Sequence, residues 1–194
     1  MNLFLWGALP YIAFTFLIVG TLVRFFYFER NWTTKSSQFL EKKQLRIANP
    51  LFHFGLLCVI GGHVVGVLIP KTWTAAIGIN DHMYHDGALY MGAVAGLIFI
   101  VGFLLLMKRR FTVAELKVNT SGLDKWLYLF LTLAIFSGMA GTLLNASGFF
   151  DYRVSIGPWF RSLLSFMPDP SLMEGVPFMF KFHMLAWMVV AIIF

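Results

Sequence analysis

The sequence predicts an all-α membrane protein with five transmembrane helices. Of its 194 residues, 59% are hydrophobic and only 12% are charged, whereas soluble domains average about 25% charged residues. The apolar residues also come in runs of about 20, the length that crosses a bilayer as a helix. We therefore expect one integral-membrane domain over residues 1–194, surrounded by the lipid bilayer, and no separate soluble domain.

The apolar runs and their borders define the expected elements. Pro50 suits the first turn of the second helix, and Asp124 suits the N-cap of the fourth. The fifth helix is still apolar at Phe194, so we expect it to be truncated, with its natural continuation beyond this residue. The five expected helices cover residues 3–23, 50–69, 87–107, 126–144 and 176–194.

The basic residues predict an orientation. Of the 15 lysines and arginines, six lie in the first connection between helices and five in the third. The positive-inside rule places these two connections in the cytoplasm and the N-terminus outside. Orientation thus accounts for the net charge of +6, and we expect no nucleic-acid partner.

Three histidines fall within the expected membrane helices. An ionisable side chain inside a membrane is costly, which points to a function. His53 and His63 are separated by a rise of about 15 Å on one helix, so one metal cannot bind both. With the expected topology, His183 reaches a depth similar to that of His63, and the two can face each other across one iron. The partner of His53 would lie deeper in the fifth helix, beyond residue 194.

Histidines at two depths are typical of two b-type haems stacked across a membrane, each held between two neutral imidazoles. Arg109 and Arg110, at the inner border, are candidates to pair with haem propionates. Glycines would make room for the flat porphyrin. Hydrogen bonding between helices is the alternative for the histidines, and close helix packing is the alternative for the glycines. The glycines are Gly55, Gly61, Gly62, Gly66, Gly92 and Gly96.

A short loop before the third helix is expected to hold His82, Tyr84 and His85. Solvated loop residues are one interpretation, and proton handling or hydrogen bonding to a quinol beside the outer haem is the other. The single cysteine, Cys58, excludes an intrachain disulfide and a Cys-x-x-Cys-His site for covalent haem.

The chain resembles the gamma subunits of respiratory nitrate reductases over nearly all of its length. The most specific matches lie at 24–32 with Ser-Ser-Gln at 36–38, at 49–63 with both histidines, at 108–110, and at 178–183. The resemblance implies that His63 and His183 bind an outer haem b and that His53 binds an inner one. The second ligand of the inner haem, another histidine in the fifth helix, is absent from this sequence.

The resemblance also implies a function. Members of the family oxidise menaquinol or ubiquinol near the outer haem in the cytoplasmic (inner) membrane. Electrons pass inward to an iron–sulfur subunit and then to a molybdenum-containing subunit that reduces nitrate. Quinol contacts would involve Gly62, His63, Tyr84 and His85, although the family's lysine at this site has no clear match here.

Three alternatives stay open at this point. The chain could serve a different soluble partner, as do related cytochrome b anchors of heterodisulfide- or sulfite-reductase complexes. It could also be a haem-free transporter whose histidines relay protons, or a purely structural anchor.

Overall fold

The computed structural model describes residues 1–27 and 41–194, and over these residues the protein is helical without strands. Four helical segments are long and apolar enough to cross a membrane, and a fifth apolar helix has 16 residues. The expected all-α membrane class is confirmed. The helices are η1 (Phe4–Ala8), α1 (Leu9–Tyr27), α2 (Lys43–His63), η3 (Val64–Leu68), α3 (Lys71–Ala76), α4 (Asp81–Thr112), α5 (Ala114–Val118), α6 (Gly122–Leu144), α7 (Ile156–Leu164), η4 (Pro170–Met173) and α8 (Phe178–Ile193).

Part of the sequence interpretation falls outside the described residues. The first connection between the expected helices, residues 24–49, is described only up to residue 27 and from Glu41 onward. The matched segments at 28–32 and 36–38 are also among the residues that the structure does not describe.

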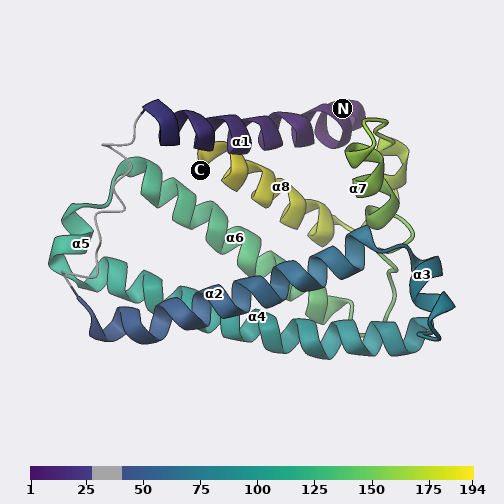
Figure 1. Ribbon diagram of the computed structural model, residues 1–194, viewed down its shortest axis with the longest axis horizontal. Coiled ribbons are helices and arrows are strands. Elements are labelled where there is room, and N and C mark those ends of the chain that lie inside the picture. The colour runs from purple at the N-terminus through teal and green to yellow at the C-terminus, as the bar shows by residue number, and fades with distance from the viewer. Residues whose placement is uncertain (28–40) are drawn as a thin grey trace.

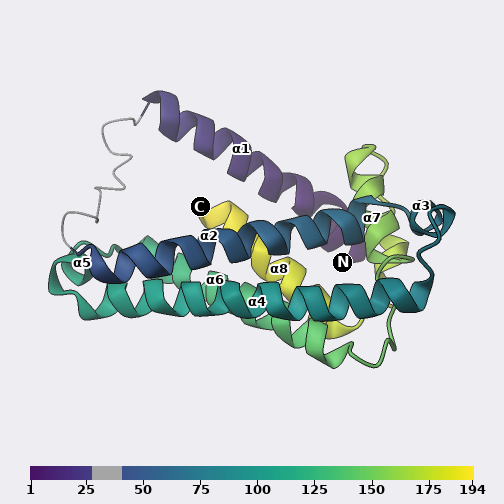
Figure 2. The same ribbon diagram turned by 60° about the horizontal axis from the view of Figure 1, so that its bottom comes forward.

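Helices α2 and α4 lie side by side along most of their lengths (Figures 1 and 2). Two glycines allow this close approach, because a Cβ at Gly55 would lie 2.5 Å from the backbone nitrogen of Phe99, and one at Gly102 would collide with the backbone of Phe52. The buried side chains of Phe99, Phe103 and Ile135 complete the core between α2, α4 and α6. Gly55 therefore serves helix packing and does not line an open gap as we expected.

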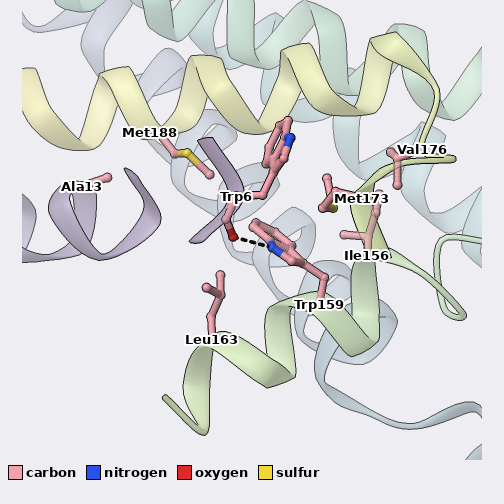
Figure 3. Close-up of a cluster of buried hydrophobic side chains, with 8 residues drawn as sticks. All are labelled: Trp6, Ala13, Ile156, Trp159, Leu163, Met173, Val176 and Met188. Atoms are coloured by element: carbon pink, nitrogen blue, oxygen red, sulfur yellow. Dashed lines mark hydrogen bonds between the residues drawn. The ribbon is translucent and has the colours of Figure 1, made fainter. Parts of the chain in front are cut away.

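A second core joins the start of the chain to α7 and α8 (Figure 3). The rings of Trp6 and Trp159 meet edge to face with centroids 5.8 Å apart. The indole nitrogen of Trp159 donates a 2.8 Å hydrogen bond to the Trp6 carbonyl, and the Tyr11 hydroxyl donates to the Leu163 carbonyl at 2.9 Å. These polar contacts lie inside an apolar cluster, so they give the α1–α7 contact a defined geometry.

Helices α2, α4 and α6 begin earlier than the apolar pattern predicted, and the difference is largest for α2 and α4. Helix α2 begins at Lys43, and the Glu41 carboxylate accepts a hydrogen bond from the Gln44 N–H in its first turn. Pro50 thus lies inside the helix, where it removes one backbone donor. Helix α4 begins at Asp81, capped by the Asn80 side chain, which accepts from the Met83 N–H. The expected loop with Tyr84 and His85 is therefore the first part of α4.

The start of α6 also differs in detail from the expectation. Ser121, and not Asp124, is the N-cap residue. Asp124 stands three residues later and accepts from the Ser121 N–H, which completes a capping box. The sequence signal was correct for a helix start, but it was assigned to the wrong member of the pair.

Candidate functional site

His63 and His183 face each other from the end of α2 and from α8. Their ring centroids are 6.0 Å apart and their planes are inclined by 24°. A metal–imidazole bond is about 2 Å long, so two imidazoles on opposite sides of one ion have ring centres roughly 6 Å apart. The observed separation fits two ligands of one iron, and the contact joins residues 120 positions apart in the sequence.

Backbone carbonyls orient both rings. The Nδ1 of His63 lies 2.7 Å from the Val59 carbonyl oxygen, and the Nδ1 of His183 lies 2.8 Å from the Ala134 carbonyl oxygen on α6. A carbonyl can only accept, so each Nδ1 carries the proton and each Nε2 keeps a free lone pair. This is the tautomer that a metal-binding histidine needs, and the carbonyl is its usual outer partner.

Small residues give the two rings their space. A Cβ at Gly138 of α6 would lie 2.7 Å from the His183 ring, so this glycine admits the imidazole. At Gly61, Gly62 and Gly92 a Cβ would meet no atom of the described residues within 4 Å, so the helix surface is open at these positions of α2 and α4. The sequence analysis did not identify Gly138 as a site residue, because its own helix contains no histidine. Its role becomes visible only through its contact with His183 in the folded structure.

The other expected glycines differ from this group. A Cβ at Gly96 would lie 2.6 Å from the methyl end of Met139, a flexible side chain. One at Gly66 would meet the side chains of Tyr84 and Tyr152 at 3.1–3.2 Å. Gly66 thus belongs to a polar cluster at the His63 end, and Gly96 belongs to the α4–α6 contact.

His53 has the same local geometry as His63, but no ring from another helix faces it within the described residues. Its Nδ1 lies 2.9 Å from the Asn49 carbonyl oxygen, so its Nε2 is also free. Its one ring contact among the described residues is with the adjacent Phe52. No group of three or more histidine, cysteine, aspartate or glutamate side chains converges within residues 1–27 and 41–194.

Arg109 and Arg110 are engaged by protein groups at the opposite end from His63. The Nε of the buried Arg109 donates to the Glu41 carboxylate at 2.9 Å, and its Nη2 donates to the Glu41 carbonyl. The Nε of Arg110 donates to the Thr120 hydroxyl at 2.9 Å, and its Nη2 lies 3.4 Å from the Asp124 carboxylate. The geometry gives both arginines a role in joining α4 to the neighbouring connections, and it offers no support for their expected propionate contacts.

The expected quinol residues lie at the His63 end. The Tyr84 hydroxyl is beside Gly66, and the Nε2 of His85 lies 3.1 Å from the Ala146 carbonyl oxygen, which ties α4 to the loop after α6. His82 forms an exposed contact with Asp86 at 3.1 Å. The structure thus brings Tyr84 close to the segment after His63, while His85 contacts Ala146 and His82 contacts Asp86.

Comparison with protein families matches residues 2–194 to the nitrate reductase gamma subunit. The chain belongs to this family. It is 46% identical over 190 residues to the nitrate reductase gamma chain of Bacillus subtilis, covering 97% of this chain and 85% of that protein. The respiratory nitrate reductase 1 gamma chain of Escherichia coli is 27% identical over 196 residues, covering all of this chain and 87% of the relative.

A further relative carries the same segment within a longer protein. The nitrate reductase-like protein NarX of Mycobacterium tuberculosis is 39% identical over 183 residues, which is 93% of this chain but 28% of NarX. Membership of the gamma-subunit family and the apolar helices together identify a multi-pass membrane protein of a family whose named members are subunits of an oxidoreductase.

Proposed function

We propose that this protein is the quinol-oxidising cytochrome b subunit of a respiratory nitrate reductase in the cytoplasmic membrane. The facing pair of His63 and His183 is the observation on which this proposal rests most. Two haems b would be bound in the full-length protein. His63 and His183 would hold one, and His53 would be a ligand of the other.

Haem b supplies reversible one-electron transfer when it is bound. The protein's contribution is to bind and orient it. The carbonyls of Val59 and Ala134 keep the protons of His63 and His183 on Nδ1, so both Nε2 atoms would be available to bind the haem iron. Because Gly138 has no side chain, α6 does not displace the His183 ring. Gly61, Gly62 and Gly92 would leave room for the flat porphyrin.

Quinol oxidation is assigned to the His63 end. A menaquinol or ubiquinol loses two electrons and two protons to become a quinone. Gly62 presents an open helix surface beside His63, and the Tyr84 hydroxyl near Gly66 offers a hydrogen-bonding group for a quinol oxygen. The His85 ring contacts the Ala146 carbonyl, so we place it at the edge of the proposed quinol site.

Electrons would leave at the His53 end, which adjoins the basic borders of α2 and α4. The positive-inside rule places this end in the cytoplasm. The acceptor would be an iron–sulfur subunit, which would pass the electrons to a molybdenum-containing subunit that reduces nitrate. Nitrate reduction itself would take place in that partner.

A reduced-minus-oxidised visible spectrum with a pyridine haemochrome count on the full-length protein tests the proposal. We expect two haems b per chain and their reduction by added menadiol, a short naphthoquinol. A folded preparation without haem would refute the cytochrome interpretation and would favour the transporter or the structural anchor. Haem that menadiol does not reduce would refute quinol oxidation alone.

A further inference from the structure

Arg153 is a buried cation for which the described residues supply no carboxylate partner. Its side chain is in the loop between α6 and α7 and the residue is 5% exposed. Burying a charge is expensive unless it is paired, so buried arginines normally form ion pairs. The ion pairs of the described residues include Arg109 and Arg110 but not Arg153.

The nearest acid in sequence is directed elsewhere. The Asp151 carboxylate lies 3.2 Å from the Nζ of Lys71 and accepts from the backbone N–H of Arg153. The guanidinium of Arg153 instead donates from Nη2 to the Thr74 hydroxyl and lies over the ring of Tyr84, with Cζ 3.7 Å from the ring centre. Its Nε is buried without a hydrogen-bond partner among the described residues.

The contacts with Thr74 and Tyr84 join the loop to α3 and α4, but they do not account for the buried, unused Nε. Arg161, the neighbouring arginine on α7, shows what a structural role looks like, because its Nη1 donates at 2.8 Å to the Val67 carbonyl and ties α7 to η3. Arg153 leaves Nε unused in the interior, and the buried Oγ of Ser155, two residues later, is also without a partner in the described part of the chain. An unpaired buried donor normally destabilises the folded protein.

The position of Arg153 relates it to the His63–His183 pair. The Tyr84 ring beneath the guanidinium extends its hydroxyl to Gly66, where the Tyr152 hydroxyl also lies. Gly66 follows His63 by three residues, a rise of about 4.5 Å for helical residues. It lies in the π-helical turn η3, a type of turn frequent at functional sites. Burial and a hydrogen bond with Tyr84 raise the pKa of Tyr152, so this hydroxyl keeps its proton at neutral pH.

We propose that Arg153 binds an anionic oxygen at the His63 end, with the Tyr84 and Tyr152 hydroxyls completing the site. A guanidinium N–H and phenolic hydroxyls are donors suited to such an oxygen. Two groups could supply it: a propionate carboxylate of the haem held by His63 and His183, or a quinol oxygen as it loses its proton. This inference rests on the proposed function, which it extends by a residue that the sequence interpretation did not include.

The test compares variants in the full-length protein within its membrane complex. Arg153→Gln removes the guanidinium and its charge, and Arg161→Gln is the matched control, an arginine lost from the same end. The readouts are haem content, the reduction equilibrium of the haem at His63, and kcat/KM for menadiol. If the oxygen belongs to a propionate, Arg153→Gln disfavours reduction about tenfold, or about 59 mV for one electron. If it belongs to the quinol, kcat/KM falls about tenfold and the haem equilibrium is unchanged.

Either shift, absent in Arg161→Gln, supports the site, and wild-type values of both readouts in Arg153→Gln overturn it. If Arg153→Gln fails to assemble, the double variant Tyr84→Phe with Tyr152→Phe decides, because it keeps both rings and removes both hydroxyls. We expect a smaller shift in the same readout, and unchanged values overturn the site. A wild-type complex without haem would overturn the proposed function as well. If the wild-type complex contains haem and oxidises quinol but Arg153→Gln changes neither readout, only this inference is overturned.

Discussion

His53 and His63 occupy two ends of one helix with nearly the same local structure. Each Nδ1 is held by the carbonyl four residues earlier, at 2.9 Å in His53 and 2.7 Å in His63. The ends differ in what other helices bring to them. At His63, α8 supplies His183 and α6 supplies the Ala134 carbonyl and Gly138. The local helix leaves Nε2 of each histidine without its proton, and within the described residues the second imidazole is found only at His63.

The two ends also use their arginines differently. At the His53 end, Arg109 is paired with Glu41 and Arg110 with Asp124. At the His63 end, Arg153 is buried and has no such pair among the described residues. A paired arginine fixes structure, while an unpaired one is able to bind an anion that arrives with a ligand.

The difference between the His53 and His63 ends is tested most directly by replacing one histidine at a time. We expect His183→Ala to abolish haem binding at the His63 end, because one proposed ligand and its orienting hydrogen bond are lost together. His53→Ala should spare that haem. Both variants of the full-length protein can be compared by haemochrome count and visible spectrum. Loss of the same haem in both variants would contradict the assignment of separate sites.

Gly138 tests whether the His63 end depends on exact packing. Gly138→Ala places a methyl group 2.7 Å from the His183 ring, and overpacking of this kind costs about 1–3 kcal/mol. We expect a lower thermal midpoint and an altered spectrum of the haem at His63.

Gly141→Ala is the matched control, because its Cβ would find its nearest neighbour at 3.8 Å. This variant should be neutral or more stable, since alanine is favoured over glycine inside a helix by up to about 1 kcal/mol. Equal effects of the two variants would mean that the His183 ring is free to move.

The sequence predicted the parts of this molecule that depend on composition and depth. Apolar runs located the membrane helices, and the equal depths of His63 and His183 anticipated their contact. The polar starts of α2 and α4 were missed because their side chains do not follow an apolar period, although Asn80 carries a cap signal. Gly138 and Arg153 could not be found, since their environments are formed by residues far away in the sequence.

At the His53 end, Glu41 links the first turn of α2 to Arg109. Hydrogen bonding from the Gln44 N–H and from Arg109 lowers the pKa of Glu41 from its ordinary value of 4.5. Because the pKa is lowered in the folded protein, the ionised carboxylate stabilises the fold fully at pH values above the ordinary pKa. This contribution is lost as the pH falls through the lowered pKa of the folded protein. Glu41→Gln should therefore reduce the thermal midpoint at pH 7 and match the wild type in acid.

The control for this change is Glu115→Gln, which alters an exposed glutamate outside the ion pairs found within the described residues. It should leave the midpoint unchanged at both pH values. A Glu41→Gln protein that is equally stable at pH 7 would show that the Glu41–Arg109 contact does not hold this end together.

The smallest effect is expected from the ion pairs at the His63 end. The Nζ of Lys71 lies 2.8 Å from the Asp81 carboxylate and 3.2 Å from that of Asp151. These two contacts raise the pKa of Lys71, so their stabilisation is complete below the ordinary value of 10.5 and is lost as the pH rises through the raised one. Exposed pairs contribute about 0.2–1 kcal/mol each.

Lys71→Gln should accordingly lower the thermal midpoint slightly at pH 7 and low salt. The difference from the wild type should shrink in about 1 M salt, where charges are screened beyond about 3 Å. A midpoint shift that salt does not change would mean that Lys71 acts through packing of its side chain. In that case side-chain packing, and not ion pairing, would stabilise the segments around Lys71, Asp81 and Asp151. The difference between the two ends would then depend on the histidines and Arg153 alone.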